Sequence, residues 1–229
     1  MKRMSIWVAS AALFLASMGI CSCSMGSTTT SEMRGSLEFT QDDLREKPFK
    51  AIDVDVVASV YYTQNDGDEC SVRLDYSAIK DAEFVQKLKE KIKVVYRDGE
   101  VKIGLTGRLK VPASCNSEKN RLKIYITSPD LVKITQEGVG AFYAKSVNSD
   151  RLEIDNEGVG SVTLDFFKGG NLKINNDGVG KVSAKVDCQV LNVDLDGVGG
   201  VHLSGVTGKY TRHKDGVGSI SDGGLKVGR

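Results

Sequence analysis

One stretch of this sequence decides its fold: residues 152–164 read Leu152-Glu153-Ile154-Asp155-Asn156-Glu157-Gly158-Val159-Gly160-Ser161-Val162-Thr163-Leu164. The Gly-Val-Gly at its centre occurs five times, at 138–140, 158–160, 178–180, 197–199 and 216–218, in steps of 20, 20, 19 and 19 residues. Self-similarity at such a period is typical of repeat proteins, in which each unit buries its apolar face against its neighbours. We therefore expect residues 131–229 to form a regular stack of rungs.

Apolar residues keep fixed distances from each Gly-Val-Gly. Six and four residues before its first glycine stand Val132, Leu152, Leu172 and Leu191, and Ile134, Ile154, Ile174 and Val193. Four and six residues after it stand Phe142, Val162, Val182 and Val201, and Ala144, Leu164, Ala184 and Leu203. Apolar residues two apart indicate a strand with one buried face. Each repeat is thus predicted to be a short strand, a tight corner, a second short strand and a variable link of six or seven residues.

Glycine suits such corners because it tolerates positive φ and close backbone approach. The corner glycines are Gly138, Gly140, Gly158, Gly160, Gly178, Gly180, Gly197, Gly199, Gly216 and Gly218. No link is long enough for the crossover helix of a βαβ unit. The fold class is therefore predicted as all-β, a stacked parallel β-solenoid with rungs of about 20 residues.

The fifth repeat departs from this pattern, because Arg212 and Asp222 occupy columns that are apolar in the four earlier repeats. The end of a solenoid must present a polar face, or it will add another chain edge to edge. We interpret this repeat as the C-terminal cap, and the alternative is a repeat that has decayed. Both predict a last rung that is less buried than the others.

An acidic residue precedes every corner. These residues form a candidate acidic stripe: Glu137, Glu157, Asp177, Asp196 and Asp215. Stacked in register, neighbouring carboxylates repel by about 1 kcal/mol even in water. Lysines close in sequence could interleave, namely Lys133, Lys173, Lys181 and Lys214. Alternatively, the stripe binds Ca²⁺, which takes carboxylate oxygens, although the Gly-Gly-x-Gly-x-Asp pattern of calcium β-rolls is missing. Solvated corner acids are the preferred interpretation, and no cofactor is expected.

The N-terminal residues read as a lipoprotein signal peptide, residues 1–22. Lys2 and Arg3 precede an apolar stretch at 6–20 that is short for a membrane span. Ile20-Cys21-Ser22-Cys23 resembles a bacterial lipobox, so Cys23 is the expected lipidation site and the link to the membrane. Cys21 is a weaker candidate, and an ordinary cleaved signal peptide is the alternative. Ser24 after the cysteine favours the outer membrane in similar lipoproteins. Residues 23–45 are rich in polar residues and are predicted to be a flexible tether.

Net charge and cysteine content bear on the partners and the disulfides of this chain. Removal of residues 1–22, which carry two positive charges and no acid, takes the formal charge from +1 to −1. A chain this close to neutral lacks the electrostatic signature of a nucleic-acid partner. An oxidising compartment permits disulfides. Cys70 and Cys115 form the candidate pair, while Cys188 is expected to be a free, buried thiol.

Residues 46–130 are β-rich but less regular, with one predicted helix at 81–91. Three passages carry a family resemblance: Phe49-Lys50-Ala51-Ile52-Asp53-Val54, the strands around Asp98-Gly99, and Ile124-Tyr125-Ile126-Thr127-Ser128-Pro129-Asp130-Leu131. With the Gly-x-Gly rungs, these passages resemble the putative auto-transporter adhesin family with a head GIN domain. The resemblance implies a right-handed, single-stranded β-helix, common in exported proteins and lipoproteins of Gram-negative bacteria related to Bacteroides.

The sequence indicates no catalytic motif. The Gly-Val-Gly corners lack the helix that a dinucleotide-binding loop requires, and neither a P-loop nor a Gly-x-Ser-x-Gly elbow is present. His202 and His213 have no spacing typical of zinc ligands and are interpreted as surface residues. The expected function is a non-catalytic binding or adhesion module of the cell envelope, with a glycan or a protein as ligand. The alternatives are a structural or signalling-accessory envelope protein, or a polysaccharide-active β-helix enzyme.

Overall fold

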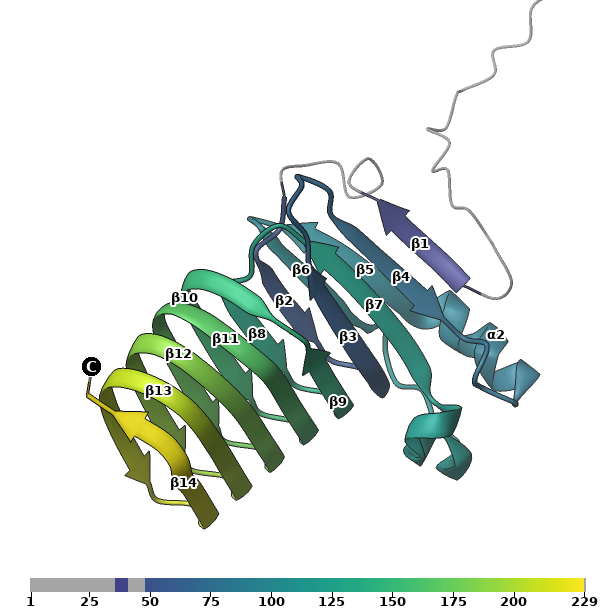
Figure 1. Ribbon diagram of the computed structural model, residues 1–229. Helices are drawn as coiled ribbons and strands as arrows, with labels where there is room; N and C mark the ends of the chain where they lie inside the picture. Colours follow the sequence, from purple (N-terminus) through teal and green to yellow (C-terminus); the bar gives the residue numbers. More distant parts are fainter. Residues whose placement is uncertain (1–35, 41–47, 229) are drawn as a thin grey trace, which may run out of the picture.

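The computed structural model describes residues 36–40 and 48–228, and it is a β-solenoid, as the repeat predicts (Figure 1). The predicted signal peptide and the lipidation site Cys23 lie outside the described residues. The strands are β1 (Ser36–Thr40), β2 (Ala51–Val54), β3 (Ala58–Gln64), β4 (Ser71–Asp75), β5 (Ile92–Arg97), β6 (Glu100–Leu105), β7 (Leu122–Ser128), β8 (Lys133–Gln136), β9 (Val139–Ala144), β10 (Val147–Asn156), β11 (Val159–Asn176), β12 (Val179–Leu195), β13 (Val198–Lys214) and β14 (Val217–Val227). The helices are α2 (Ala82–Lys91) and the 3₁₀ turns η1 (Ala113–Asn116) and η2 (Glu118–Asn120). In the described part of the chain, no helix has both the length and the apolar character needed to span a membrane.

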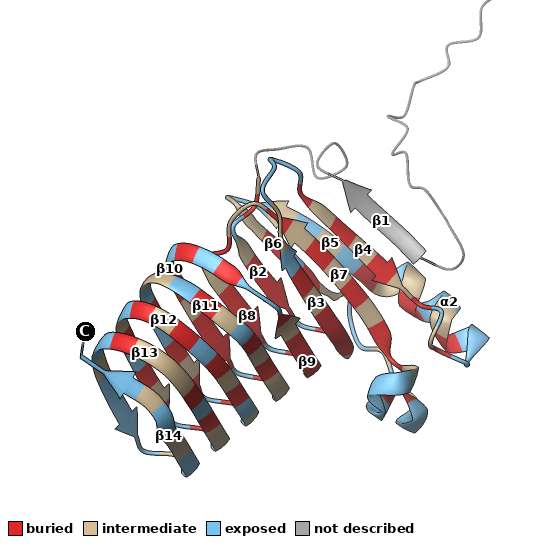
Figure 2. Cartoon of the chain, viewed as in Figure 1, coloured by how far each residue is buried: buried red, intermediate tan, exposed pale blue. Residues whose placement is uncertain are grey.

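The Gly-Val-Gly repeats stack in parallel and in register. After the corner, Val139, Val159, Val179, Val198 and Val217 are consecutive partners across β9, β11, β12, β13 and β14. The residues of the apolar columns predicted from the first four repeats are all buried except Val132, which is only half-buried. The last rung is less buried, and Figure 2 shows β14 in exposed and intermediate colours. There, Arg212 and Asp222 form an ion pair of 2.6 Å.

The prediction of two short strands followed by a variable link is wrong, because the link is itself part of the strand. β11, β12 and β13 run for 18, 17 and 17 residues from one corner almost to the next, and the links pair like the rest of the strand. Their inward positions are also apolar or small, since Phe167, Val186 and Cys188 are fully buried. Pairing satisfies the backbone groups of the link, which burial would otherwise leave without partners. The pairing shifts register between Leu164 and Phe167 where β11 meets β12, and between His202 and Ser204 where β13 meets β14.

The corners are tight because each rung sits directly on the preceding one. A Cβ atom added to Gly160 would lie 1.7 Å from the carbonyl oxygen of Gly140. Inside the corner, Gln136, Asn156 and Asn176 are completely buried, and Asn156 Nδ2 donates to Asn176 Oδ1 at 2.6 Å. A ladder of buried amides therefore lies under a corner in which side chains are excluded at the glycines.

A sixth rung precedes the five Gly-Val-Gly rungs, and the sequence analysis missed it. β2 pairs with β8 and β3 pairs with β9, both in parallel, with Val54 opposite Gln136 and Ala58 opposite Gly140. Residues 55–57 therefore stand where 137–139 stand in the next rung, so that Asp55 continues the acidic stripe. Acid-x-Val is the signal that this corner shares with the others, but its two glycines are replaced by Val56 and Ala58.

A seventh layer, which has a loop in place of a corner, covers the N-terminal end of the solenoid. β6 stacks on β2 and β7 on β3, and residues 106–121 replace the corner between them with a loop that contains η1 and η2. Here no corner carbonyl lies above Ala58, which explains why a side chain fits in place of glycine. Helix α2 packs Phe84 and Leu88 into the apolar core at this end, and Asp81 caps it by accepting a hydrogen bond of 2.9 Å from the Phe84 backbone N–H.

Antiparallel strands finish the two sheet edges at this end. β5 and β6 form a hairpin around Asp98 and Gly99, which both have positive φ, as the Asp-Gly pair predicts. On the other edge, β4 pairs with β7, and β1 pairs with β4. The prediction of a tether over the whole of 23–45 is therefore wrong for residues 36–40, where Leu37 and Phe39 alternate with polar residues as in a strand.

Candidate ligand-binding surfaces

The structure brings the acidic stripe together at the solenoid corners, and the stripe is exposed along its length. Most of the nearby lysines pair with carboxylates of the strands that lead into the corners, not with the stripe itself: Lys133 lies 3.0 Å from Asp155, and Lys173 lies 2.8 Å from Glu153. Within the stripe, Lys102 reaches Glu137 at 3.5 Å and also pairs with the buried Asp53. Lys181 and Lys214, also expected to interleave, have no ion pair within the described residues.

Charge repulsion is concentrated at the C-terminal half of the stripe. Burial, followed by the charges of Asp196, Asp194 and Asp155, raises the pKa of Asp177 above its usual value. In contrast, hydrogen bonds to carboxylates raise the pKa values of Lys102, Lys133 and Lys173, all of which lie toward the N-terminal side.

One group in this half has donors that could hold a cation. The ligand atoms of Asp194, Asp196 and His213 lie within 4.8 Å of one another, and His213 Nε2 also lies 3.2 Å from Asp215. Carboxylates suit Ca²⁺, but its shell of six to eight oxygens would need several waters here, and imidazole is a ligand of other metals. His202 lies on the other side of the corner, so the two histidines do not form a joint site.

The predicted disulfide is absent: Cys70 and Cys115 are both buried, free thiols. Cys70 precedes β4, whose first residue lies opposite Thr127 near the end of β7, whereas Cys115 precedes the start of β7 at Leu122. The length of β7, roughly 20 Å, separates the two sites, far more than a disulfide can bridge. Cys188 is free and buried, as expected, and its thiol donates to Thr207 Oγ1 at 3.5 Å.

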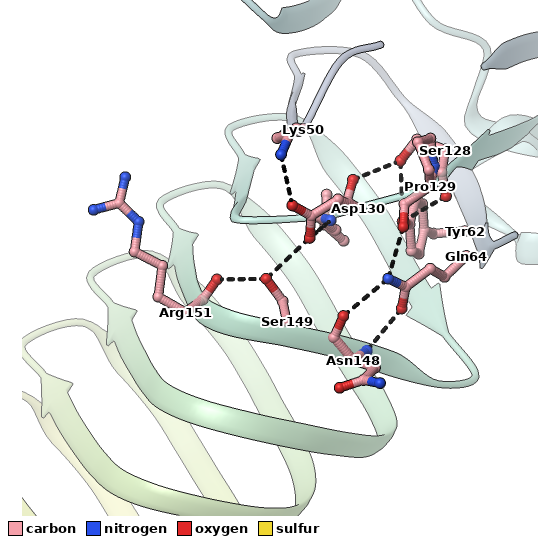
Figure 3. Close-up of polar contacts among 10 residues, drawn as sticks. Lys50, Tyr62, Gln64, Ser128, Pro129, Asp130, Asn148, Ser149 and Arg151 are labelled. Atoms are coloured by element: carbon pink, nitrogen blue, oxygen red, sulfur yellow. Dashed lines mark hydrogen bonds and ion pairs between the residues drawn. The ribbon is translucent and has the colours of Figure 1, made fainter. Parts of the chain in front are cut away.

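A polar cluster at the other end of the rungs is structural. Asp130 accepts hydrogen bonds from Lys50 Nζ at 3.0 Å and from Ser149 Oγ at 3.0 Å, and it therefore joins three rungs (Figure 3). Gln64 bonds to the backbone of Asn148 in both directions, at 2.7 and 2.9 Å. These side chains use their polar groups on one another, so the cluster fastens the sixth rung to the regular solenoid.

A trough of about 570 Å³ crosses the outer surface of β2, β8, β10, β11 and β12. Apolar groups of Val132 and Val190 lie along it, and its polar lining comes from Lys133, Arg151, Glu153, Asn171, Lys173 and Asn192. Amide and charged groups that converge over an apolar floor are typical of surfaces that recognise ligands. The trough follows the stacking direction, so it suits an extended ligand.

A ladder of tyrosines crosses the opposite sheet on its outer face. Tyr125 on β7, Tyr61 on β3 and Tyr143 on β9 stack with ring-centroid distances of 5.3 and 5.4 Å and interplanar angles of 21° and 18°. Arg73 covers the first ring, at 4.0 Å from the centroid of Tyr125. Tyr143 Oη donates to Glu118 in η2 at 3.2 Å. Burial and the neighbouring Glu118 carboxylate raise the pKa values of Tyr61 and Tyr143. The sequence could not reveal this ladder, because its rings come from three distant positions.

Two of the solved structures that are similar to this chain come from Parabacteroides distasonis. One is a crystal structure of a putative adhesin from Parabacteroides distasonis, with 19% identity and a TM-score of 0.65 over 84% of this chain and 74% of that chain. The other, from the same organism, is a structure of a putative lipid binding protein, with 21% identity and a TM-score of 0.64 over the same shares. At these identities the likeness establishes the fold alone.

A search of the curated proteins found no match. The family model described as putative auto-transporter adhesin, head GIN domain, matches residues 48–229, which is most of the chain. The chain therefore belongs to the family of putative auto-transporter adhesins with a head GIN domain.

Proposed function

We propose that this protein is an envelope lipoprotein, anchored through Cys23 in the outer membrane, that acts as a non-catalytic binding module. The observation that carries the binding role is the trough across β2, β8, β10, β11 and β12, where amide and charged side chains follow the stacking direction. Membership of an adhesin-type family suggests an envelope or exported protein, which agrees with the lipobox at residues 20–23.

The arrangement of the carboxylates favours binding over catalysis. A glycoside hydrolase needs two carboxylates in different environments across a cleft, one to donate a proton and one to act as base or nucleophile. Here, the stripe repeats one environment at successive corners, and its members point to solvent. Along the trough, the acid Glu153 is paired with Lys173 and has no second carboxylate opposite it among the lining residues.

The binding role is tested with the full mature chain. Binding to immobilised glycans and envelope proteins is measured beside release of reducing ends from the same glycans. We expect saturable binding without turnover, and weaker binding when Asn171→Asp and Asn192→Asp replace the trough amides. Turnover that a single acid-to-amide change abolishes would instead establish an enzyme.

The anchor and its orientation need a separate experiment. Cells are labelled with a fatty-acid analogue, and Cys23→Ala is compared with Cys21→Ala as its matched control. We expect Cys23→Ala alone to lose the label. Protease treatment of intact cells then distinguishes a surface adhesin, which is digested, from a periplasmic structural or signalling-accessory protein, which is protected.

A further inference from the structure

The tyrosine ladder has one covered end and one open end. Arg73 lies over the outer face of Tyr125, and Tyr61 is stacked on both of its faces. The centroid distances of 5.3 and 5.4 Å are close to the strand spacing of about 4.8 Å. The rings therefore stack along the ladder direction, and the free face of Tyr143 is directed toward the next strand, β11.

The position where a fourth ring would stand is occupied by a short side chain. Thr163 on β11 is the partner of Tyr143, and Ser183 on β12 is the partner of Thr163. The next partner along these strands, His202 on β13 opposite Ser183, is the first with a larger side chain. A flat space bounded by Tyr143 and His202, with two hydroxyl groups as its floor, is thus left open on the outer face.

Cationic groups flank the far half of this space. Lys181 and Lys185 lie two residues to either side of Ser183 on β12, and both are exposed and outside every ion pair in the described part of the chain. Lys181 and His202 also line a shallow hollow of about 630 Å³ around Gly200, which continues the surface toward the last rung. An acid bound over Ser183 would therefore meet two lysines that form no ion pair within the described residues, with the exposed Asp165 on β11 as the nearest carboxylate in the register.

We propose that this surface binds an acidic polysaccharide that lies along the solenoid axis. One pyranose ring stacks its C–H face on Tyr143 above Thr163, since the face of an aromatic ring is electron-rich and attracts C–H groups. The next sugar lies over Ser183, and its carboxylate or sulfate group is held by Lys181 and Lys185 through charge-assisted hydrogen bonds. This surface lies on the sheet opposite the trough, so the inference goes beyond the proposed function and adds a second binding site to it.

A protein ligand fits this surface less well. An aromatic side chain of a partner could also stack on Tyr143, but the residues next to it, Thr163, Ser183 and Lys185, are polar and do not exclude water, and the exposed valines Val159 and Val179 lie further off, at the corner. Protein interfaces concentrate their binding free energy in such desolvated centres. A sugar, in contrast, uses surrounding hydroxyl and ammonium groups as hydrogen-bond partners.

The test measures binding of an oligogalacturonate to the mature chain by calorimetry, with a neutral galactose oligomer of the same length as reference. We expect the acidic oligomer to bind more tightly and to lose affinity as salt is raised. Lys181→Gln with Lys185→Gln should weaken it by about tenfold, whereas Lys168→Gln on another segment should not. Tyr143→Leu should weaken both oligomers, whereas Tyr125→Leu at the covered end should change binding little.

Thr163→Tyr separates a binding role from a structural one. The new ring extends the stack, so we expect an unchanged or higher melting temperature together with loss of binding. Undiminished binding by Thr163→Tyr would overturn the proposal, as would equal affinity for acidic and neutral oligomers that the two lysines do not affect. Binding of a protein in the screen above, with no oligosaccharide bound, would overturn this inference alone. Absence of any ligand in both screens would count against the proposed function as well.

Discussion

Replacing Gly160 by alanine should destabilise the solenoid strongly, because this corner has no room for a side chain. The added Cβ atom would lie 1.7 Å from the oxygen and 2.7 Å from the carbon of the Gly140 carbonyl. Real Cβ contacts essentially never fall below 3.0 Å. The two rungs must therefore part locally until the contact with the oxygen has lengthened from 1.7 Å to at least 3.0 Å.

Such a separation breaks the hydrogen bonds that close the corner. Val159 N–H donates to Gly138 O at 3.0 Å, and Gly158 N–H donates to Gln136 O at 2.8 Å. Each bond lost in a buried place costs about 1–3 kcal/mol. Together with residual strain, we expect a loss of roughly 3–5 kcal/mol in the free energy of unfolding. For a domain of this size, that corresponds to a melting temperature lower by roughly 6–20 °C.

The assay is thermal and urea unfolding followed by circular dichroism. Gly67→Ala is the matched control, because nothing lies within 4 Å of a Cβ atom added there, and its effect should stay within about 0.5 kcal/mol. Gly218→Ala has the same clash, at 1.6 Å, but lies on the last rung, which can move away from its single neighbour; its cost should be smaller. If Gly160→Ala unfolds like Gly67→Ala, the close stacking of the corners is refuted.

Three further predictions concern charge and thiols. The pKa of Asp177 is higher in the folded state than in the unfolded state, so ionisation of this carboxyl lowers the stability of the fold as the pH rises above the unfolded-state pKa. Asp177→Asn should therefore raise the melting temperature at pH 7 by roughly 1–3 °C. The gain should vanish in unfolding scans below pH 3.8, where the carboxyl is protonated in both states. Lys102→Met leaves the carboxylate of Asp53, which is 6% exposed, without its 2.5 Å partner, so urea unfolding should show a loss of about 1–2 kcal/mol, and an unaffected midpoint would contradict this. Burial raises the pKa values of the Cys70 and Cys188 thiols, so a thiol reagent at pH 8 should label them only after unfolding, and rapid labelling of the native chain would show that these sites are open.

The regular part of the fold could be predicted from local spacing, but the N-terminal part could not. The columns of Ile154 and Val162 stay apolar at fixed distances from the corner in the first four repeats, so one face of each strand there is identifiable from sequence. The sixth rung keeps apolar residues at these distances, Ile52 and Val60, but its corner cannot be found from sequence, because Val56 and Ala58 replace the glycines where no corner lies above them. Its first strand begins at Ala51 and pairs with a strand that begins only at Lys133, and no local pattern records such a distant pairing.

The candidate binding surfaces illustrate the same limit. The acidic stripe was predictable, because Glu157 and Asp177 each precede a corner at a fixed distance. The tyrosine ladder was not, since Tyr61, Tyr125 and Tyr143 become neighbours only through pairing of β3 with both β7 and β9. The ion pairs of the acidic stripe could not all be predicted either, because Lys102, which pairs with Asp53 and reaches Glu137, comes from the irregular N-terminal part.

The stacking of β2 and β3 on β8 and β9 sets the order in which the chain can fold. Each Gly-Val-Gly rung meets the rung that follows it directly in the chain, whereas the rung of residues 51–64 must wait for strands that begin at Lys133 and Val139. Contacts between distant positions form late, because their loop-closure entropy precedes any gain from pairing. We therefore expect the solenoid to nucleate among its C-terminal repeats, so that strands made early in synthesis are among the last to find their neighbours.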